Sequence, residues 1–390
     1  MMAGTPLISS RGSVIPFAKL AAAFVVLVAV LAAAPAQGDA AKRKVPRGFV
    51  GTTLDGPLRS ASQALQSRQY PKMAASGVET LRVAFHWSQA QPEKDGPIDL
   101  SHTDRIVEQA AARGIRVFPH IIVAPLWNRW DLSEEPLAPP SDPEALRPYM
   151  KALIERYGPN GTLWLEHPEL PRLPISHWQF WNEPQLPYQW TIPDNVDWAD
   201  SYAWELKSFS LGVRENDPTA KVVLGGLTNA SWEALDKLYG EGIKDDFDIA
   251  AVHPYTQKPA GVVEIVRRFR AVMRRHGDAG KEVFVTELGL PASRGRTRSK
   301  NKLQTTDRGM ASFLSEAYRA LVKARGRQST RVSRVYWYTW ASSYSGDIFS
   351  YTGLFRYRAG KLKARRAYRA FVTTAAALNG CRKTTAGRCR

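Results

Sequence analysis

The chain has 390 residues, 44% of them hydrophobic, so it can bury a large core. Its formal net charge is +18, yet it contains none of the nucleic-acid-binding motifs, which argues against a nucleic-acid partner. We interpret the basic surface as solvated, with a peripheral contact to acidic envelope polymers or lipid head groups as the alternative. Of the two cysteines neither has a histidine or carboxylate near it in the sequence, which excludes a cysteine-based metal site.

The amino-terminal segment has the pattern of an export signal. Arg11 and Lys19 precede an apolar run over 20–34, and Ala34-Pro35-Ala36 follows it. We predict a secretory signal peptide over residues 1–36 and a short basic linker over 37–45. The alternative is a retained membrane anchor. The apolar run is shorter than the roughly 20 residues of a membrane-spanning helix, which favours the signal peptide. We therefore expect a secreted protein, or one retained at the cell envelope.

From residue 46 onward, short apolar runs alternate with helix-like stretches. The runs that predict strands cover 48–54, 80–87, 115–122, 177–184, 221–227, 248–255, 282–289 and 335–340. Between them, 101–114 and 261–277 repeat apolar residues at three- and four-residue spacing, the first with Ser101 as its cap. This alternation predicts an α/β fold, a (β/α)8 TIM barrel over 46–380. A doubly wound open sheet is the alternative, but no Gly-x-Gly-x-x-Gly motif follows the first run.

Two basic segments stand apart from this alternation. Residues 293–302, "SRGRTRSKNK", are predicted to form a long loop after the seventh strand. We interpret the loop as solvated, with a contact to an acidic ligand as the alternative. Residues 381–390 form a basic tail in which Cys381 and Cys389 could make one short disulfide in an oxidising compartment.

Polar residues follow most of the predicted strands at their carboxyl ends, the face on which such barrels carry chemistry. Glu183 ends the fourth strand and Glu287 the seventh, so the two carboxylates can approach one bond from opposite sides of the barrel mouth. Glycoside hydrolysis uses such a pair, one carboxyl protonated as an acid and the other ionised. It needs no metal and no cofactor, and the histidines here are scattered singly rather than at ligand spacing.

At these residues the chain resembles the clan A glycoside hydrolases, which are retaining (β/α)8 enzymes. "WNEP" at 181–184 and "VTELG" at 285–289 are similar to the two catalytic signatures of that clan, and 81–117 is similar to the second βα unit of families 39, 42 and 5. The remaining family 5 positions are matched in order by Arg82, His120, His253, Tyr255 and Trp340. His120 departs from the family pattern, because it lies in "FPHII" and not beside a second histidine.

The resemblance implies a role for each matched residue. Glu183 is expected to be the acid/base and Glu287 the nucleophile. Arg82 and Tyr255 are expected to donate to Glu287, and Asn182 to bind the sugar 2-hydroxyl. His253 orients the acid/base or a hydroxyl, or is a structural histidine; His120 contacts substrate, and Trp340 lies under the reacting sugar.

Further aromatic side chains are candidates for contact with a sugar. Trp178 and Trp181 are candidate walls of the pocket, and six aromatic residues lie in predicted loops: Trp127, Trp130, Tyr188, Trp190, Trp232 and Tyr344. We therefore expect a secreted retaining β-glycosidase that acts on an oligo- or polysaccharide. The alternative is a non-catalytic, envelope-associated carbohydrate-binding barrel.

Overall fold

Residues 42–130, 137–325 and 330–380 are described by the computed structural model of the protein. The chain divides into two units, Met1–Asp39 and Ala40–Arg390, and every described residue belongs to the second. The predicted signal peptide and the tail with Cys381 and Cys389 lie outside the described residues. No helix among the described residues is long and apolar enough to cross a membrane.

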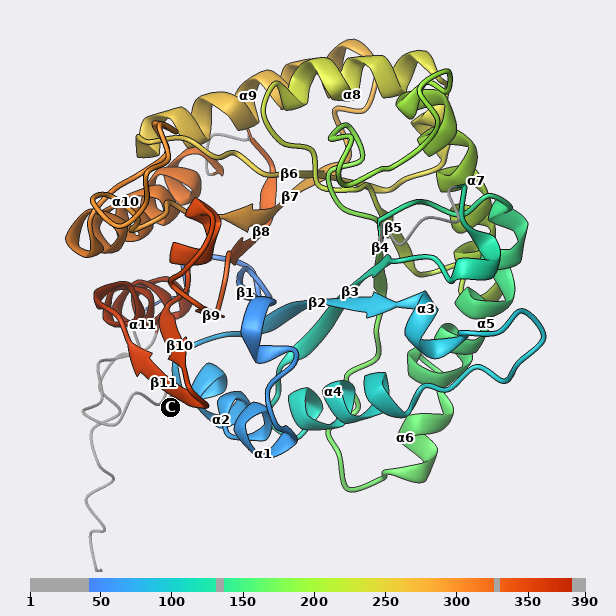
Figure 1. Ribbon diagram of the computed structural model, residues 1–390, viewed down its shortest axis with the longest axis horizontal. Coiled ribbons are helices and arrows are strands. Elements are labelled where there is room, and N and C mark those ends of the chain that lie inside the picture. The colour runs from blue at the N-terminus through green and yellow to red at the C-terminus, as the bar shows by residue number, and fades with distance from the viewer. Residues whose placement is uncertain (1–41, 131–136, 326–329, 381–390) are drawn as a thin grey trace, which may run out of the picture. The chain divides into compact units, whose positions relative to one another are not determined.

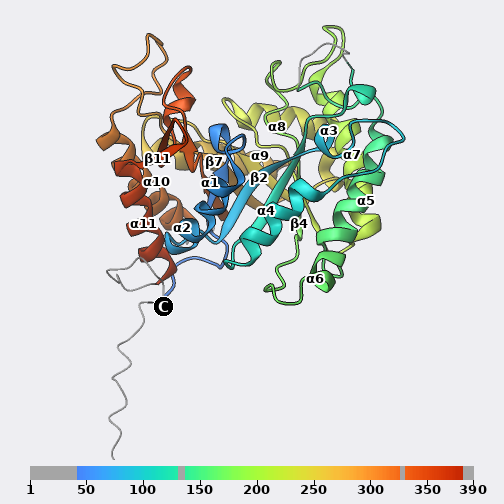
Figure 2. The same ribbon diagram turned by 60° about the horizontal axis from the view of Figure 1, so that its bottom comes forward.

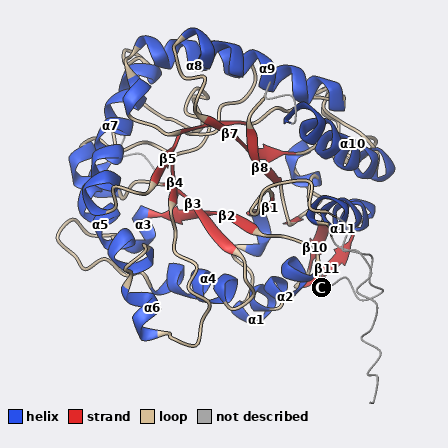
Figure 3. Ribbon diagram, turned by 180° about the vertical axis from the view of Figure 1, so that it is seen from behind, coloured by secondary structure: helices blue, strands red, loops and turns tan. Residues whose placement is uncertain are grey.

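Eight parallel strands form a closed barrel, in which each strand pairs with the next and β1 pairs with β8. The strands are β1 Val50–Leu54, β2 Thr80–His86, β3 Arg116–Ile122, β4 His177–Phe180, β5 Lys221–Val223, β6 Ile249–Val252, β7 Glu282–Leu288 and β8 Val332–Trp337. Figure 3 shows them as an inner ring surrounded by helices. The (β/α)8 prediction is confirmed, and the pairing of β1 with β8 rules out the open sheet.

The surrounding helices lie between consecutive strands and after the last one. They are α1 Gln63–Ser67, α2 Gln69–Ala75, α3 Trp87–Ala90, α4 Ser101–Ala111, α5 Leu146–Tyr157, α6 Thr162–Glu166, α7 Trp198–Asn216, α8 Ser231–Gly240, α9 Pro259–Arg275, α10 Asp307–Arg325 and α11 Arg366–Asn379. In α9 the buried residues Val262, Val266, Phe269 and Met273 recur every three or four positions, so one face packs against the strands.

The start of α4 differs from the prediction in one detail. Ser101 is its first helical residue and does not cap the helix with its side chain. Instead Asp99 accepts a hydrogen bond from the backbone N–H of Ser101 at 2.8 Å, which satisfies one of the donors that a helix start leaves free.

Side chains fill the interior of the barrel. A separate buried cluster lies there, formed by Phe118, Val223, Ile249, Ala251, Phe284 and Tyr336. Gly51 on β1 makes room for the ring of Tyr336, because a Cβ atom at this position would lie 2.4 Å from Cδ1 of that ring. The interior of the barrel is thus a packed core, and a site built on the strands can form only at one of the barrel's ends.

A small second sheet follows β8. Its strands are β9 Ala341–Ser342, β10 Phe355–Arg358 and β11 Lys361–Ala364, in the order β11-β10-β9, and it lies beside α11 (Figure 1). The sequence analysis did not predict it. The predicted loop over 293–302 is confirmed, since no helix or strand interrupts the chain between β7 and α10 (Figure 2).

Candidate active site

The chain turns sharply after β4 and presents two polar side chains at the mouth of the barrel. β4 ends at Phe180, earlier than predicted, and Trp181 and Glu183 have positive φ angles of 61° and 48°. Asn182 forms an isolated bridge with Gly226, and the N–H of Glu183 donates to the carbonyl of Gly226 at 3.0 Å. Positive φ is uncommon for residues other than glycine and often marks functional positions. This backbone turn brings Asn182 and Glu183 over the end of the barrel.

Glu287 reaches the same mouth from β7. The pairing of β7 with β8 shifts register between Val285 and Leu288, so the strand is irregular at Glu287. The side chain is 10% exposed, similar to the 12% of Glu183. The two glutamates predicted to approach one bond lie close together at the same end of the barrel, with one oxygen of each within 4.8 Å of the other.

Arg82 on β2 joins the two sides of the mouth. Its side chain is 1% exposed and donates three hydrogen bonds of 2.8 Å each. The acceptors are Glu287 Oε1, Asn182 Oδ1 and Gln179 Oε1. A guanidinium group can hold such a planar set of acceptors, whereas an ammonium group cannot. Arg82 therefore fixes the carboxylate of Glu287 and turns the amide nitrogen of Asn182 away from itself.

Tyr255 holds the other oxygen of Glu287. Its hydroxyl donates to Glu287 Oε2 at 2.7 Å, and its ring packs edge-on against Phe349 with centroids 5.0 Å apart. Burial raises the pKa of the Tyr255 hydroxyl well above its ordinary value, and the charge of Glu287 adds to this. The phenol is therefore a stable hydrogen-bond donor that, with Arg82, stabilises negative charge on Glu287.

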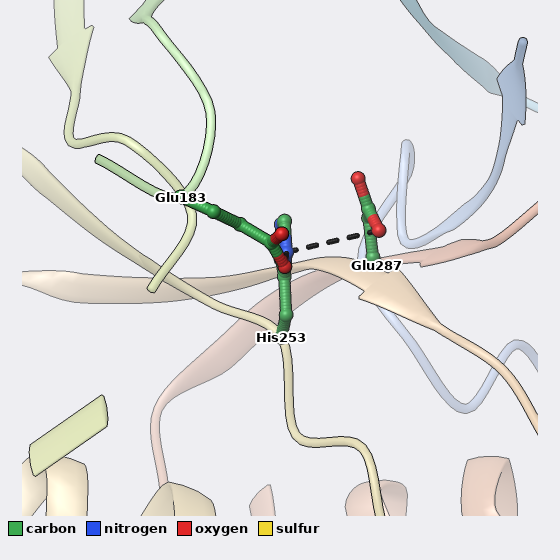
Figure 4. A group of neighbouring side chains, drawn as sticks. All are labelled: Glu183, His253 and Glu287. Carbon is green, nitrogen blue, oxygen red and sulfur yellow. Dashed lines mark hydrogen bonds and ion pairs between the residues drawn. The ribbon is translucent and has the colours of Figure 1, made fainter. Parts of the chain in front are cut away.

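His253 lies between the two carboxylates (Figure 4). Its Nδ1 atom is 2.7 Å from Glu183 Oε1 and 3.7 Å from Glu287 Oε2, and its Nε2 atom is 2.9 Å from the hydroxyl of Thr286. If the Thr286 hydroxyl donates to Nε2, then Nδ1 carries the proton and donates to Glu183. This leaves the second oxygen of Glu183 free for a ligand.

Gly226 leaves the space that the imidazole ring of His253 occupies. A Cβ atom on Gly226 would lie 2.0 Å from His253 Nε2, closer than any non-bonded contact allows. Gly226 also accepts the hydrogen bond from the backbone of Glu183. Gly226 therefore both holds the backbone of Glu183 through a hydrogen bond and leaves space for the imidazole ring of His253.

The environment of Glu183 favours the protonated form. Burial raises the pKa of the Glu183 carboxyl and the charge of Glu287 raises it further, against an opposing effect of His253. One oxygen of each glutamate and a nitrogen of His253 lie within 4.8 Å of one another. The site therefore holds two carboxyl groups close together. The surroundings of Glu183 favour its protonated form, whereas Arg82 and Tyr255 stabilise the ionised form of Glu287.

This geometry agrees with comparisons to known proteins. The family described as cellulase, glycosyl hydrolase family 5, matches residues 62–343. The chain belongs to this glycoside hydrolase family. It is thus a member of a group of enzymes that act on O-glycosyl bonds, as predicted. No curated protein matches the chain.

Solved structures of glycosidases share the fold of this family 5 member at low identity. A family 39 glycoside hydrolase from Bacteroides cellulosilyticus WH2 has a TM-score of 0.63 at 17% identity, covering 86% of this chain and 64% of that one. A monomeric β-xylosidase from Caulobacter crescentus CB15 has a TM-score of 0.60 at 18% identity, covering 85% and 69%. An intracellular xylanase from Thermoanaerobacterium saccharolyticum JW/SL-YS485 has a TM-score of 0.54 at 19% identity, covering 84% and 96%.

His120 on β3 is 8% exposed and lies within the electrostatic range of Arg82 and His253. Its Nδ1 atom has no hydrogen-bond partner within the described residues. Burial lowers the pKa of the His120 imidazole well below its ordinary value, and the charge of Arg82 lowers it further. The Nδ1 atom is itself buried, so the structure does not bring it into contact with a substrate hydroxyl.

The placement of Trp340 corrects one prediction. Trp340 is fully buried, its ring packs against Phe355 and Tyr368, and its N–H lies 3.4 Å from Gln69 Oε1. These partners belong to α2, β10 and α11 on the outside of the barrel, so Trp340 offers no face to a sugar at the mouth. The structure does not support its predicted role as a platform.

The two predicted tryptophan walls are also core residues. Trp178 on β4 is fully buried and precedes Gln179, which points into the barrel toward Arg82, so Trp178 faces the helices. Trp181 is 2% exposed, packs edge-on against Trp190, and donates to the carbonyl of Gln189 at 2.5 Å. Neither ring is accessible to a substrate.

Among the predicted loop aromatics, Tyr188 differs from the rest. It is 65% exposed, and partial burial of its hydroxyl, together with the charges of Glu183 and Glu287, raises the pKa of that hydroxyl. Trp190 and Tyr344 are buried, and Trp127, Trp130 and Trp232 are half-buried. Tyr188 is therefore the member of this set best placed to stack against a sugar ring.

Four residues of the mouth were not predicted from the sequence. Gln179 and Thr286 bond to Arg82 and His253, and the hydroxyl of Tyr338, just after β8, donates to Asp55 at 3.0 Å. Burial and the charges of Asp55 and Glu287 raise the pKa of Tyr338. For Gln179 the signal was available, since a polar residue alternating with Trp178 and Phe180 points inward.

Glu183, His253 and Glu287 are also close enough together to bind a metal ion. The contacts that these side chains already make suit a pair of carboxyl groups better than a metal site. The guanidinium of Arg82 already lies 2.8 Å from Glu287, and Nδ1 of His253 is bonded to Glu183. A second cation here would compete with Arg82 for the same carboxylate.

Proposed function

We propose that this family 5 chain is a secreted, retaining β-glycosidase that hydrolyses an oligo- or polysaccharide by double displacement. The observation that carries the proposal is the closeness of Glu183 and Glu287, which have oxygens within 4.8 Å of each other. In retaining glycosidases the carboxyl groups are about 5–5.5 Å apart, whereas inverting enzymes separate them by about 6.5–9.5 Å to admit a water molecule.

The first step follows from the different contacts of the two glutamates. Glu287, ionised and held by Arg82 and Tyr255, attacks the anomeric carbon and forms an ester with the sugar. The glycosidic C–O bond breaks, and its oxygen takes the proton of Glu183 as the leaving group departs. Burial raises the pKa of Glu183, so the carboxyl keeps this proton to a higher pH than an ordinary glutamate does.

The second step reverses these roles. Glu183, now ionised, accepts a proton from a water molecule that attacks the same anomeric carbon, and the bond to Glu287 breaks. The hydrogen bond from His253 to Glu183 supports the ionised form during this step. Asn182, whose amide nitrogen is turned away from Arg82, is placed to bind the hydroxyl next to the reacting carbon.

Aryl β-glycosides of several sugars, with proton NMR of the first product, test this proposal. We expect hydrolysis of at least one sugar, with the β-anomer released first and the α-anomer appearing only by mutarotation. The α-anomer as first product would contradict double displacement. Lack of hydrolysis across the panel, together with binding of the sugars, would favour the carbohydrate-binding alternative.

Export is proposed from the sequence of residues 1–36, which lie outside the described residues. N-terminal sequencing of protein recovered from culture medium tests it. We expect the mature chain to begin at Gln37, or a few residues later. Intact Met1 on membrane-associated protein would indicate a retained anchor instead.

A further inference from the structure

A cavity of about 750 Å³ lies between α10 and α11, and none of its lining residues belongs to the site described above. The two helices run side by side on the outside of the barrel (Figures 1 and 2). Five arginines line the cavity: Arg308, Arg319, Arg365, Arg366 and Arg369. Glu316 is the one carboxylate among the lining residues. The cavity is therefore strongly positive.

Most of this charge has no carboxylate partner among the described residues. Arg365 pairs with Asp307, whose carboxylate also binds Arg296 at 2.9 Å. Arg308, Arg319, Arg366 and Arg369 are exposed, and no carboxylate of the described residues lies within 4.0 Å of them. Several like charges around one cavity repel one another, and an anion in the cavity would remove that repulsion.

The charges are arranged so that both helices contribute to the same space. On α10 Arg308, Ser312, Ser315 and Arg319 follow one another at four-, three- and four-residue steps, so they share one face. Arg366 and Arg369 lie on the first turn of α11, at its positive end. The hydroxyl of Ser315, which lines the cavity, accepts a hydrogen bond from the hydroxyl of Thr374 on α11 at 3.1 Å, so its own O–H can donate elsewhere. Guanidinium and hydroxyl donors thus converge from two sides.

The lining favours one kind of ligand over others. No lining residue is aromatic, so nucleic-acid bases would find no stacking surface. A concave space between two helices does not fit a flat membrane surface. Residues 381–390 carry four basic and no acidic side chains, so the chain's own tail is not a complementary occupant. Arginine forks match carboxylate and sulfate groups, and serine hydroxyls suit sugar hydroxyls.

We propose that the cavity between α10 and α11 is a second binding site, for an acidic polysaccharide. The basic loop 293–302 continues the positive surface from the cavity, because Arg296 binds Asp307 at the start of α10. That loop follows β7, the strand that carries Glu287, so an acidic chain bound in the cavity can extend toward the face of the barrel that holds the catalytic site. The proposal does not depend on the reaction proposed above.

Calorimetric titration of the full chain with charged and uncharged oligosaccharides tests this site. The probes are hexagalacturonate, a chondroitin sulfate hexasaccharide, and fully methyl-esterified hexagalacturonate as the uncharged match. We expect the wild-type protein to bind an acidic probe but not the ester, more weakly as salt is added. The double variant Arg366→Gln/Arg369→Gln should bind at least about tenfold more weakly.

The matched control is Arg105→Gln/Arg113→Gln, on α4 and in the turn that follows it, which removes two exposed arginines from another part of the surface and so changes the net charge equally. It should bind like the wild type. Equal loss in both double variants would show a general charge effect and overturn the proposal, as would failure of both acidic probes. Tighter binding of single-stranded DNA or anionic vesicles through Arg366 and Arg369 would also overturn it. Turnover plays no part in the measurement, so its outcome is separate from that of the proposed reaction.

Discussion

Nη1 of Arg82 on β2 lies 2.8 Å from Oε1 of Glu287 on β7, in a site where the arginine side chain is 1% exposed. The same guanidinium also binds Gln179 on β4 and Asn182 just after it, so one buried side chain sets the positions of a carboxylate and of two amides. Replacing one member of this set leaves buried donors or acceptors without partners. The desolvation free energy of such groups is larger than the net stabilisation that the hydrogen bonds contribute.

The substitution Arg82→Lys should therefore lower kcat/KM by about a hundredfold or more while the charge is retained, because an ammonium group cannot serve all three acceptors. The control is Arg270→Lys. Arg270 is also buried, but it binds the backbone carbonyls of Ala279 and Lys281 on the outside of the barrel. Both variants should lose thermal stability, and only Arg82→Lys should lose activity per folded molecule. Equal activity in the two variants would contradict the role of Arg82.

Glu183→Ala should reduce turnover of substrates with poor leaving groups by about 10²–10⁴-fold, and that of activated aryl glycosides much less. The reason is that an activated leaving group needs little protonation, whereas an alcohol leaving group depends on the acid. Azide should partly restore activity on activated substrates and yield a glycosyl azide. An equal loss on both classes of substrate would remove Glu183 from the acid/base role.

Gly226→Ala places a Cβ atom 2.0 Å from His253 Nε2, so the imidazole must move away from Glu183 and Thr286. We expect kcat/KM to fall by about a hundredfold, as misplacement of a group by about 1 Å does elsewhere. Gly240→Ala at the end of α8 meets no atom within 4 Å and should keep wild-type activity. Unchanged activity in Gly226→Ala would mean that the position of His253 does not matter for turnover.

Glu205 on α7 gives a stability prediction away from the site. It is fully buried, and neither of its carboxyl oxygens has a hydrogen-bond partner among the residues described. Burial raises the pKa of Glu205 well above its ordinary value, and the nearby indole of Trp130 opposes this only in part. The folded protein therefore binds this proton more tightly than the unfolded chain does.

The contribution of that proton to stability is present at low pH and is lost as pH rises from the ordinary pKa through the raised one. Glu205→Gln mimics the protonated side chain. The melting temperature of this variant should match that of the wild type at about pH 5 and exceed it at about pH 8. The expected gain is at most about 1.4 kcal/mol per pH unit. Glu316→Gln on the surface serves as the control. A constant difference across pH would contradict a buried, protonated Glu205.

The barrel could be predicted from the sequence because each strand is a short apolar run between two helical patterns, and eight such runs have few alternative folds. The small sheet after β8 was missed. In "FRYRAGKLKA" the hairpin turn lies at Ala359 and Gly360, both with positive φ, and alanine at such a position carries no turn signal. The turn after β4 carries no such signal either, because Trp181 and Glu183 take positive φ angles on both sides of Asn182, which bridges to the distant Gly226.

The positions of Glu183 and Glu287 at the mouth were predicted from their places after the fourth and seventh apolar runs, where barrels carry their functional residues, and from the resemblance of "WNEP" and "VTELG" to the clan A signatures. The orientation of Trp340 was not predictable. It lies three residues beyond the end of β8, and the chain there has already turned toward β9 on the outside of the barrel. Distance along the sequence does not give the direction of a side chain once the strand has ended. The Tyr338–Asp55 contact joins the ends of β8 and β1, which no local pattern connects.

Mass spectrometry after inactivation with a 2-deoxy-2-fluoro glycoside tests the central assignment most directly, because the fluorinated sugar slows hydrolysis of the covalent intermediate. The account predicts one sugar per chain, attached to Glu287 in the peptide that holds Val285 to Gly289, and no label in Glu287→Gln. The neighbouring contacts support this site of attachment, since Arg82 and Tyr255 hold both oxygens of Glu287 at the mouth. A label on Glu183, or turnover of the natural substrate without any covalent intermediate, would contradict it.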